Sequence, residues 1–228
     1  LQVTKTESVL GPEHDLTTTR PFIFDFASGD FPHQGTLAQR DEYLFGTMAA
    51  AGKAVGLGRY LESRRIYTSA QFRQLDGSSR TEHIGIDLFL PAEAPLHAPL
   101  DGVVHSFANN TLPLDYGPAV ILQHELDGVT FHTLYGHLTV DSLDGLNVGD
   151  TIKAGQRFCA IGDERVNGGW PAHLHFQIVL DMGGKCGDFP GVCTPAQRAL
   201  YVDLCPDPNF ILKVQDAGTP SPMPEKSA

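Results

Sequence analysis

Two short motifs in this sequence of 228 residues place histidines where they can do chemistry, among ten histidines in all. Asp87 follows His83 after three residues, and His175 follows His173 after one. Imidazole nitrogens and carboxylate oxygens are common protein ligands of zinc. Either motif alone arises easily by chance in a chain with this many histidines, so the residues around each motif decide its meaning.

The first motif lies in a segment that predicts a β-strand. Ile84, Gly85 and Ile86 disfavour a helix. Because side chains alternate between the faces of a strand, His83, Gly85 and Asp87 are expected to share one face. Gly85 would then leave open space above the backbone, as a bound ion requires. A surface strand with an ordinary histidine and aspartate is the alternative.

The second motif alternates in the same way along residues 173–180. His173, His175 and Gln177 fall on one face of the predicted strand, and the opposite face is apolar. Two imidazoles on one face can bind a single metal ion, or one can bind while the other moves a proton. A polar strand face without a ligand is the alternative.

A third segment, 131–138, contributes His137. Gly136 directly before it indicates a close backbone approach or a bulge. Together the three segments supply an imidazole, a carboxylate and an imidazole, with two imidazoles to spare. Three protein ligands and an open fourth position make a catalytic zinc site. Since the sequence contains no His-Glu-x-x-His, a spare histidine must supply the acid–base function.

These residues resemble the M23 peptidases, the lysostaphin-like zinc metalloendopeptidases. The family pattern is His-x-x-x-Asp, then Tyr-x-His-Leu, then His-Leu-His-Phe. The chain contains all three motifs in that order within residues 80–180, as His83–Asp87, Tyr135–Leu138 and His173–Phe176.

The resemblance implies a fold, a cofactor and a reaction. We expect a mostly β fold in which an antiparallel sheet floors a groove, with a short helical N-terminal extension. One Zn²⁺ per chain would be held by His83, Asp87 and His175, and His137 and His173 would be catalytic. The substrate would be a peptide, and in this family the cleaved bond often contains glycine and lies in a peptidoglycan cross-link.

Three further residues are predicted to bind the substrate. Tyr135 belongs to the family motif. The glycine-rich loop 162–171 departs from the family's usual Gly/Ser/Thr pattern but should border the groove. Within it, Trp170 is expected to wall the groove, with a packing role as the alternative. Asn167 is expected to donate a hydrogen bond to a substrate carbonyl.

The pattern along the chain predicts three regions. Residues 1–62 form an irregular arm with a helix from Leu37 to about Ala51, capped by Thr36. A second helical turn is expected over 59–65. Residues 63–213 form the metallopeptidase domain, and residues 214–228 form a proline-rich tail. An arm that lies over the groove would make the enzyme latent.

The composition of the chain excludes some classes of binding partner. The net charge of −11 argues against nucleic acid, and no apolar run approaches the ~20 residues that a membrane span needs. A non-catalytic, zinc-containing binding or scaffold domain within a larger chain remains the alternative function. A biotinyl or lipoyl carrier is excluded, since such a carrier needs a modified lysine between its halves and residues 107–147 contain no lysine.

The context of the chain is left open by its sequence. The chain begins at Leu1, and residues 189–209 look like the M23-type segment of bacterial fusion proteins, where it lies between a phosphotransferase-like kinase region and a class III aminotransferase. An excised fusion domain would be cytoplasmic, whereas a mature wall hydrolase would be periplasmic or secreted. Cys186 and Cys193 can close a small disulfide loop or remain free thiols.

Overall fold

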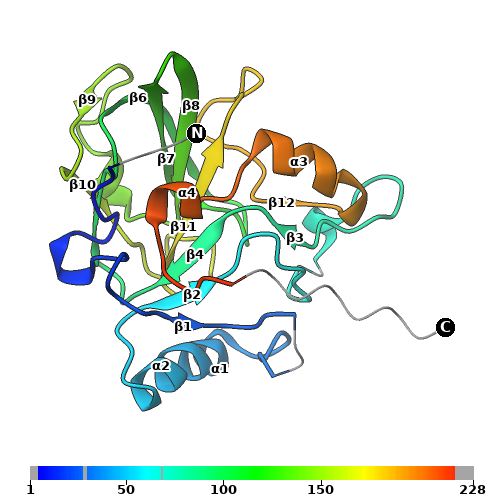
Figure 1. Ribbon diagram of the computed structural model, residues 1–228. Coiled ribbons are helices and arrows are strands. Elements are labelled where there is room, and N and C mark those ends of the chain that lie inside the picture. Colours follow the sequence, from blue (N-terminus) through cyan, green and yellow to red (C-terminus); the bar gives the residue numbers. More distant parts are fainter. Residues whose placement is uncertain (1–4, 28–29, 68, 219–228) are drawn as a thin grey trace.

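A computed structural model describes residues 5–27, 30–67 and 69–218. As expected, the fold is mostly β, built on one eight-stranded sheet (Figure 1). Neighbouring strands pair antiparallel throughout this sheet except at one edge, where β1 and β2 are parallel. The sheet comprises, in spatial order, β1 (Phe22–Ile23), β2 (Gly56–Gly58), β4 (Ile86–Phe89), β11 (His173–Val179), β8 (Val129–Gly136), β7 (Gly117–Leu126), β6 (Gly102–Asn110) and β9 (Thr151–Ile152).

Smaller elements surround the main sheet. Two short antiparallel pairs are β5 (Pro95–His97) with β10 (Arg157–Ala160), and β3 (Glu82–His83) with β12 (Val192–Cys193). The α-helices are α1 (Leu37–Asp41), α2 (Thr47–Ala50), α3 (Arg198–Leu204) and α4 (Asn209–Leu212), with a π-helical segment η2 (Glu42–Gly46) between the first two. The 3-10 helices are η1 (Pro12–His14), η3 (Ala70–Phe72), η4 (Val140–Leu143) and η5 (Pro195–Gln197).

The helix predicted for the arm is present as the continuous run α1–η2–α2. Its first residue follows Thr36, whose hydroxyl accepts a hydrogen bond from the Gln39 amide, while the Gln39 side chain accepts one from the Thr36 amide. The second predicted turn, over residues 59–65, is wrong. That segment is irregular because its backbone pairs with other chain segments, including a bridge between Ser63 and Glu82.

Part of the predicted N-terminal arm extends the main sheet. β2 pairs antiparallel with β4, with Gly58 opposite Asp87, and β1 adds to the outer side of β2. Helices α1 and α2 lie beside this edge, away from β6–β9 (Figure 1). Of the predicted tail, residues 219–228 fall outside the described part of the chain.

The apolar face predicted for β11 is confirmed. Leu174, Phe176 and Ile178 are fully buried in the main core, where they meet the apolar side chains of β4 and β8. The opposite face of β11 is also buried, but it carries His173, His175 and Gln177. A well-packed layer behind the histidines gives them a rigid floor.

The single strand predicted for residues 83–88 is divided in two. His83 belongs to β3 and pairs with β12, whereas Asp87 belongs to β4 in the main sheet. The chain changes pairing partner at Gly85. The space beside this glycine is not open, because an added Cβ would lie 2.5 Å from Cε1 of His175. Gly85 therefore makes room for the side chain of His175.

The possible disulfide is not formed. All four cysteines lie in the described part of the chain, and each is a free thiol. Cys186 is exposed while Cys193 is buried. None of the described helices has both the length and the apolar character needed to cross a bilayer.

We predict that Gly117→Ala is far more destabilising than Gly128→Ala. Both glycines have positive φ, so both variants carry backbone strain of about 1–2 kcal/mol. Only at Gly117 would the new Cβ collide with backbone, at the Val166 carbonyl; at Gly128 nothing lies within 4 Å. Urea unfolding of both variants measures the difference, and equal losses would contradict this packing.

Candidate metal centre

The structure brings three ligand atoms from different strands to one point. Nε2 of His83 and Nδ1 of His175 are 3.0 Å apart, and each is 3.1 Å from Oδ1 of Asp87. The pairing of β4 with β11 sets Asp87 directly opposite His175. Of the described residues, these three form the one group that could hold a metal ion.

Outer hydrogen bonds fix which ring nitrogen carries the proton. Nδ1 of His83 lies 3.1 Å from the Arg59 carbonyl, which can only accept, so this nitrogen is protonated. Nε2 of His175 lies 2.9 Å from Oε1 of Gln177. The Gln177 amide is oriented by donation to the Pro190 carbonyl, so its oxygen faces His175 and accepts from it.

A cation fits this geometry. With both protons turned outward, two imidazole lone pairs and a carboxylate oxygen face one another with no hydrogen between them, an arrangement that is repulsive without a positive charge. Ligand atoms at ~2.0–2.1 Å from a tetrahedral zinc lie about 3.3 Å apart, close to the separations observed. Two nitrogens and one oxygen are a donor set that zinc accepts, and the outer partners resemble those that orient metal-binding histidines.

Two more imidazoles face the same centre. Nδ1 of His137 donates to the Asn167 carbonyl at 2.9 Å, and Nδ1 of His173 donates to the Pro171 carbonyl at 2.7 Å. Their rings lie 4.3 Å apart, centroid to centroid. In both rings Nε2 is therefore the acceptor, and in His173 it lies 3.9 Å from Oδ1 of Asp87. His137 has a φ of 64°, a left-handed conformation that is uncommon for a histidine.

Burial determines the charge of these groups. It lowers the pKa of His173 and, with the neighbouring imidazoles adding to the effect, lowers that of His137 well below its usual value. Both are therefore neutral near pH 7. Burial alone would raise the pKa of Asp87, but His83, Arg64 and His173 together outweigh it and hold that pKa well below its ordinary range. The carboxylate is thus ionised.

A buried network of ion pairs holds the carboxylate of Asp87. Nη1 of Arg64 donates to Oδ2 of Asp87 at 2.5 Å, leaving Oδ1 for the ligand position. Nε of the same guanidinium donates to Oε2 of Glu62 at 3.1 Å, and Oε1 of Glu62 accepts from the Phe26 amide. Arg64 is 5% exposed and Glu62 1%. The arm therefore reaches the candidate ligand through two side chains.

The three residues predicted to bind the substrate lie in different environments. Tyr135 is fully buried in the core, packed against Phe158 and Phe176, because alternation along β8 turns it to the apolar face. The Asn167 side chain is fully buried and bonded within its own loop, so it holds the loop whose carbonyl receives His137. Trp170 does line the cavity above the histidines.

Sequence reasoning missed Arg64 and Tyr116. The hydroxyl of Tyr116 lies 3.4 Å from Nε2 of His175, and its ring fills the space beside Gly136. The glycine predicted a close approach but not its partner. Nothing local marks Arg64, since its partner Asp87 is 23 residues away in sequence.

The cavity above the site has a volume of about 400 Å³. That size lies within the ~300–1,000 Å³ range of small-ligand sites. Its floor includes both histidine pairs and Asp87, and its walls include aromatic side chains from the arm and from residues 66–72. The arm thus forms part of the cavity wall.

Comparison with known proteins finds one matching family model. Residues 81–185, a little under half of the chain, match the family model Peptidase_M23, described as Peptidase family M23. The matched span contains His83, Asp87, His137, His173 and His175, whereas Arg59, Glu62 and Arg64 precede it. No curated protein matches the chain.

Several solved structures are similar at low identity. The catalytic domain of the antimicrobial peptidase lysostaphin from Staphylococcus simulans is 24% identical over 62% of this chain and 90% of its own, with a TM-score of 0.39. A zinc-containing peptidase from Vibrio cholerae is 22% identical over 53% of this chain, with a TM-score of 0.35, and Csd3 from Helicobacter pylori is 19% identical over 64%, with a TM-score of 0.34. The chain covers 36% of each of these last two proteins.

We predict that Arg64→Ala destabilises the metal-free protein by about 3–5 kcal/mol, because it leaves the buried carboxylate of Asp87 without its cation and leaves Glu62 with only the longer pair to Arg59. Urea unfolding measures the loss. Arg165→Ala is the control: Arg165 pairs with Asp163 at the surface, so its loss should cost far less than the loss of Arg64. A similarly small loss for Arg64→Ala would mean that the network contributes little.

We also predict that the metal-free protein loses stability as the pH falls below about 6.5. Burial, and then the charge of Arg64, lowers the pKa of His83 to about 4, whereas an unfolded histidine titrates near 6.5. Between these values the unfolded chain binds more protons than the folded one, so the free energy of unfolding decreases on acidification.

For His83 alone the loss between pH 7.5 and pH 5 is about 2 kcal/mol. Urea unfolding at both pH values measures it, and His83→Gln should remove that part of the pH dependence. A stability that stayed constant over this range would contradict a buried neutral His83.

Proposed function

We propose that the protein is a zinc-dependent endopeptidase of the M23 type, which hydrolyses peptide bonds and has peptidoglycan cross-link peptides as its candidate natural substrates. The observation that carries the proposal is the convergence of three proton-free ligand atoms beside two neutral imidazoles, on the floor of a cavity of about 400 Å³. The match of residues 81–185 to Peptidase family M23 supports it.

His83, Asp87 and His175 would hold the metal. When bound by three protein groups, zinc polarises a carbonyl and lowers the pKa of water at its open position toward ~7. The chain's contribution is orientation: the Arg59 carbonyl holds the ring of His83, Gln177 holds that of His175, and Arg64 holds the carboxylate of Asp87. Each ligand is thus fixed before the metal arrives.

His137 and His173 would move the proton. Each presents an unprotonated Nε2 to the centre, because its Nδ1 hydrogen is donated to a backbone carbonyl. One imidazole takes a proton from the attacking water at this nitrogen. Once protonated, Nε2 becomes a donor, which is the group needed to hydrogen-bond a developing oxyanion or a leaving amine. Either ring can act as the general base, and the other ring can then act as the hydrogen-bond donor.

The wider context is part of the same proposal. Residues 189–209 support a chain that works within a longer bacterial protein, fused to other enzyme domains. A zinc-containing scaffold domain would need the ligands but not the pair of neutral imidazoles, so the pair favours an enzyme over this alternative.

We predict that His137→Ala and His173→Ala each lower the turnover of peptide substrates by about 10²–10⁴-fold while one zinc per chain is retained. His175→Ala should lose both zinc and activity. Metal content by mass spectrometry and hydrolysis of oligoglycine, peptidoglycan stem peptides and unstructured protein measure these effects, with His105→Ala on β6 as the histidine control.

Loss of zinc in His173→Ala would make His173 a ligand and reverse its assignment. If the zinc-loaded protein cleaves none of the three substrate types but still binds one of them, the scaffold function replaces the proposed one.

A further inference from the structure

The cavity has two apolar walls that the zinc chemistry does not require. The arm wall consists of Phe26, Phe31, Leu44, Ile66 and Phe89. The tryptophan wall consists of Tyr67, Phe72, Trp170 and Val192. Ile66, in the arm wall, also packs against the tryptophan wall. All nine side chains line the cavity whose floor holds the candidate metal ligands.

Each wall contacts one of the two proton-moving histidines. The ring of Phe89 stacks on that of His173, with centroids 5.2 Å apart, and Trp170 meets the edge of His137 at 6.4 Å. Each wall is therefore adjacent to the place where the cleaved peptide bond of the substrate would lie. Side chains on either side of that bond are the groups within reach of them.

The arm wall is rigid and preformed. Phe26 and Phe31 pack edge to face at 4.8 Å, and the guanidinium of Arg64 lies 4.8 Å above the Phe26 ring. Leu44 on η2 is 1% exposed. A wall held in place before binding costs little ordering on binding, so the apolar surface it offers contributes fully to recognition.

We propose that this cavity is a specificity pocket for a bulky apolar side chain, aromatic or leucine-sized, on a residue next to the cleaved peptide bond. The inference rests on the proposed function and narrows its substrate class. A glycine at that position would leave the cavity unfilled and the small exposed part of each wall in contact with water, whereas an apolar side chain would fill the cavity and cover that surface. Phe26, Phe31 and Leu44, which precede the family-matched span, would set this preference.

The first test is a peptide series with Gly, Ala, Leu or Phe on either side of one cleavable bond. At one of the two positions, we expect Leu or Phe to raise kcat/KM about 10- to 100-fold over Gly. Equal rates, or faster cleavage of the glycine peptide, overturn the pocket while leaving the peptidase intact. Absence of cleavage throughout the series, with zinc bound, is instead the failure of the proposed function.

A binding test on the metal-free protein is independent of activity. Trp170 is the single tryptophan of the chain, so its fluorescence reports on the cavity directly. Titration with N-acetyl-phenylalanyl-glycinamide should give a saturable change, and N-acetyl-glycyl-glycinamide should give none at the same concentrations. No change with the phenylalanine peptide, or equal changes with both, would overturn the proposal.

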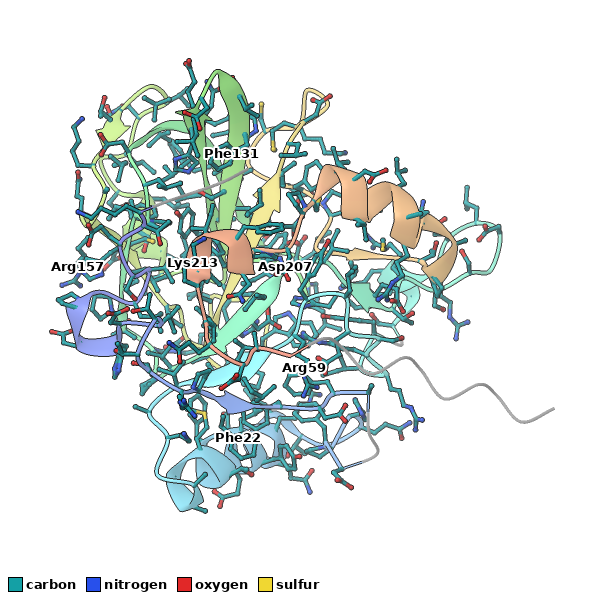
Figure 2. The ribbon with its side chains drawn as sticks, viewed as in Figure 1. Phe22, Arg59, Phe131, Arg157, Asp207 and Lys213 are labelled. Carbon is teal, nitrogen blue, oxygen red and sulfur yellow. The ribbon has the colours of Figure 1, made fainter. Side chains whose placement is uncertain are left out.

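A pair of variants locates the effect. Phe31→Ala should reduce the ratio of Phe to Gly cleavage about tenfold. Phe22→Ala should leave the ratio unchanged, because Phe22 packs on the same aromatic cluster but does not line the cavity. Figure 2 shows Phe22 on β1, at the edge where α1 and α2 lie. Equal effects of both variants would assign the loss to the cluster as a whole and overturn the pocket.

Should Phe31→Ala fail to fold, Ile66→Trp gives the opposite perturbation. Ile66 is half-buried, and a larger side chain there narrows the cavity from its rim. The preferred side chain should then shift from Phe toward Ala. A preference for Phe that survives this substitution would contradict the assignment of the arm wall.

Discussion

The carboxylate of Asp87 is the point on which the molecule depends. One oxygen faces two imidazole nitrogens, and the other receives the guanidinium of Arg64. A buried carboxylate is unfavourable unless its oxygens have partners, and Arg64 supplies the partner of Oδ2. Oδ1 faces two proton-free nitrogens, so a cation at that point would stabilise all three groups. The fixed cation on Oδ2 also holds the carboxylate so that Oδ1 is turned toward the two imidazole nitrogens.

The strand carrying His173 and His175 was predictable because its signal is local. Alternation with period two places these side chains together whatever the rest of the chain does. The mostly β fold was expected from the resemblance to the M23 peptidases. Residues His83 to Asp87 show the limit of this reasoning. Their types predicted a strand, but only tertiary pairing decides that the strand breaks at Gly85 and continues in another sheet.

The errors share a physical cause. Tyr135 lies in the same motif as His137, yet β8 turns Tyr135 into the core while the chain turns at His137. Arg64 and Glu62 look like ordinary surface charges, because burial of an ion pair depends on partners far along the chain. Helix α1 was predictable from Thr36 as its N-cap and from the helical spacing of apolar residues, both of which are local signals. Signals between residues close in sequence predicted α1 and β11 correctly. Pairing between residues far apart in sequence could not be predicted from the sequence.

The placement of β1 and β2 has a consequence for any shortened form of the protein. Without them, β4 would be the outermost strand of the sheet, with a row of unpaired amide and carbonyl groups along the residues that include Asp87. Such open edges are templates for strands of other molecules. The two N-terminal strands thus cover the edge of β4 and prevent it from pairing with another molecule. The new edge strand, β1, has only two residues, so it offers few backbone groups with which a further strand could pair.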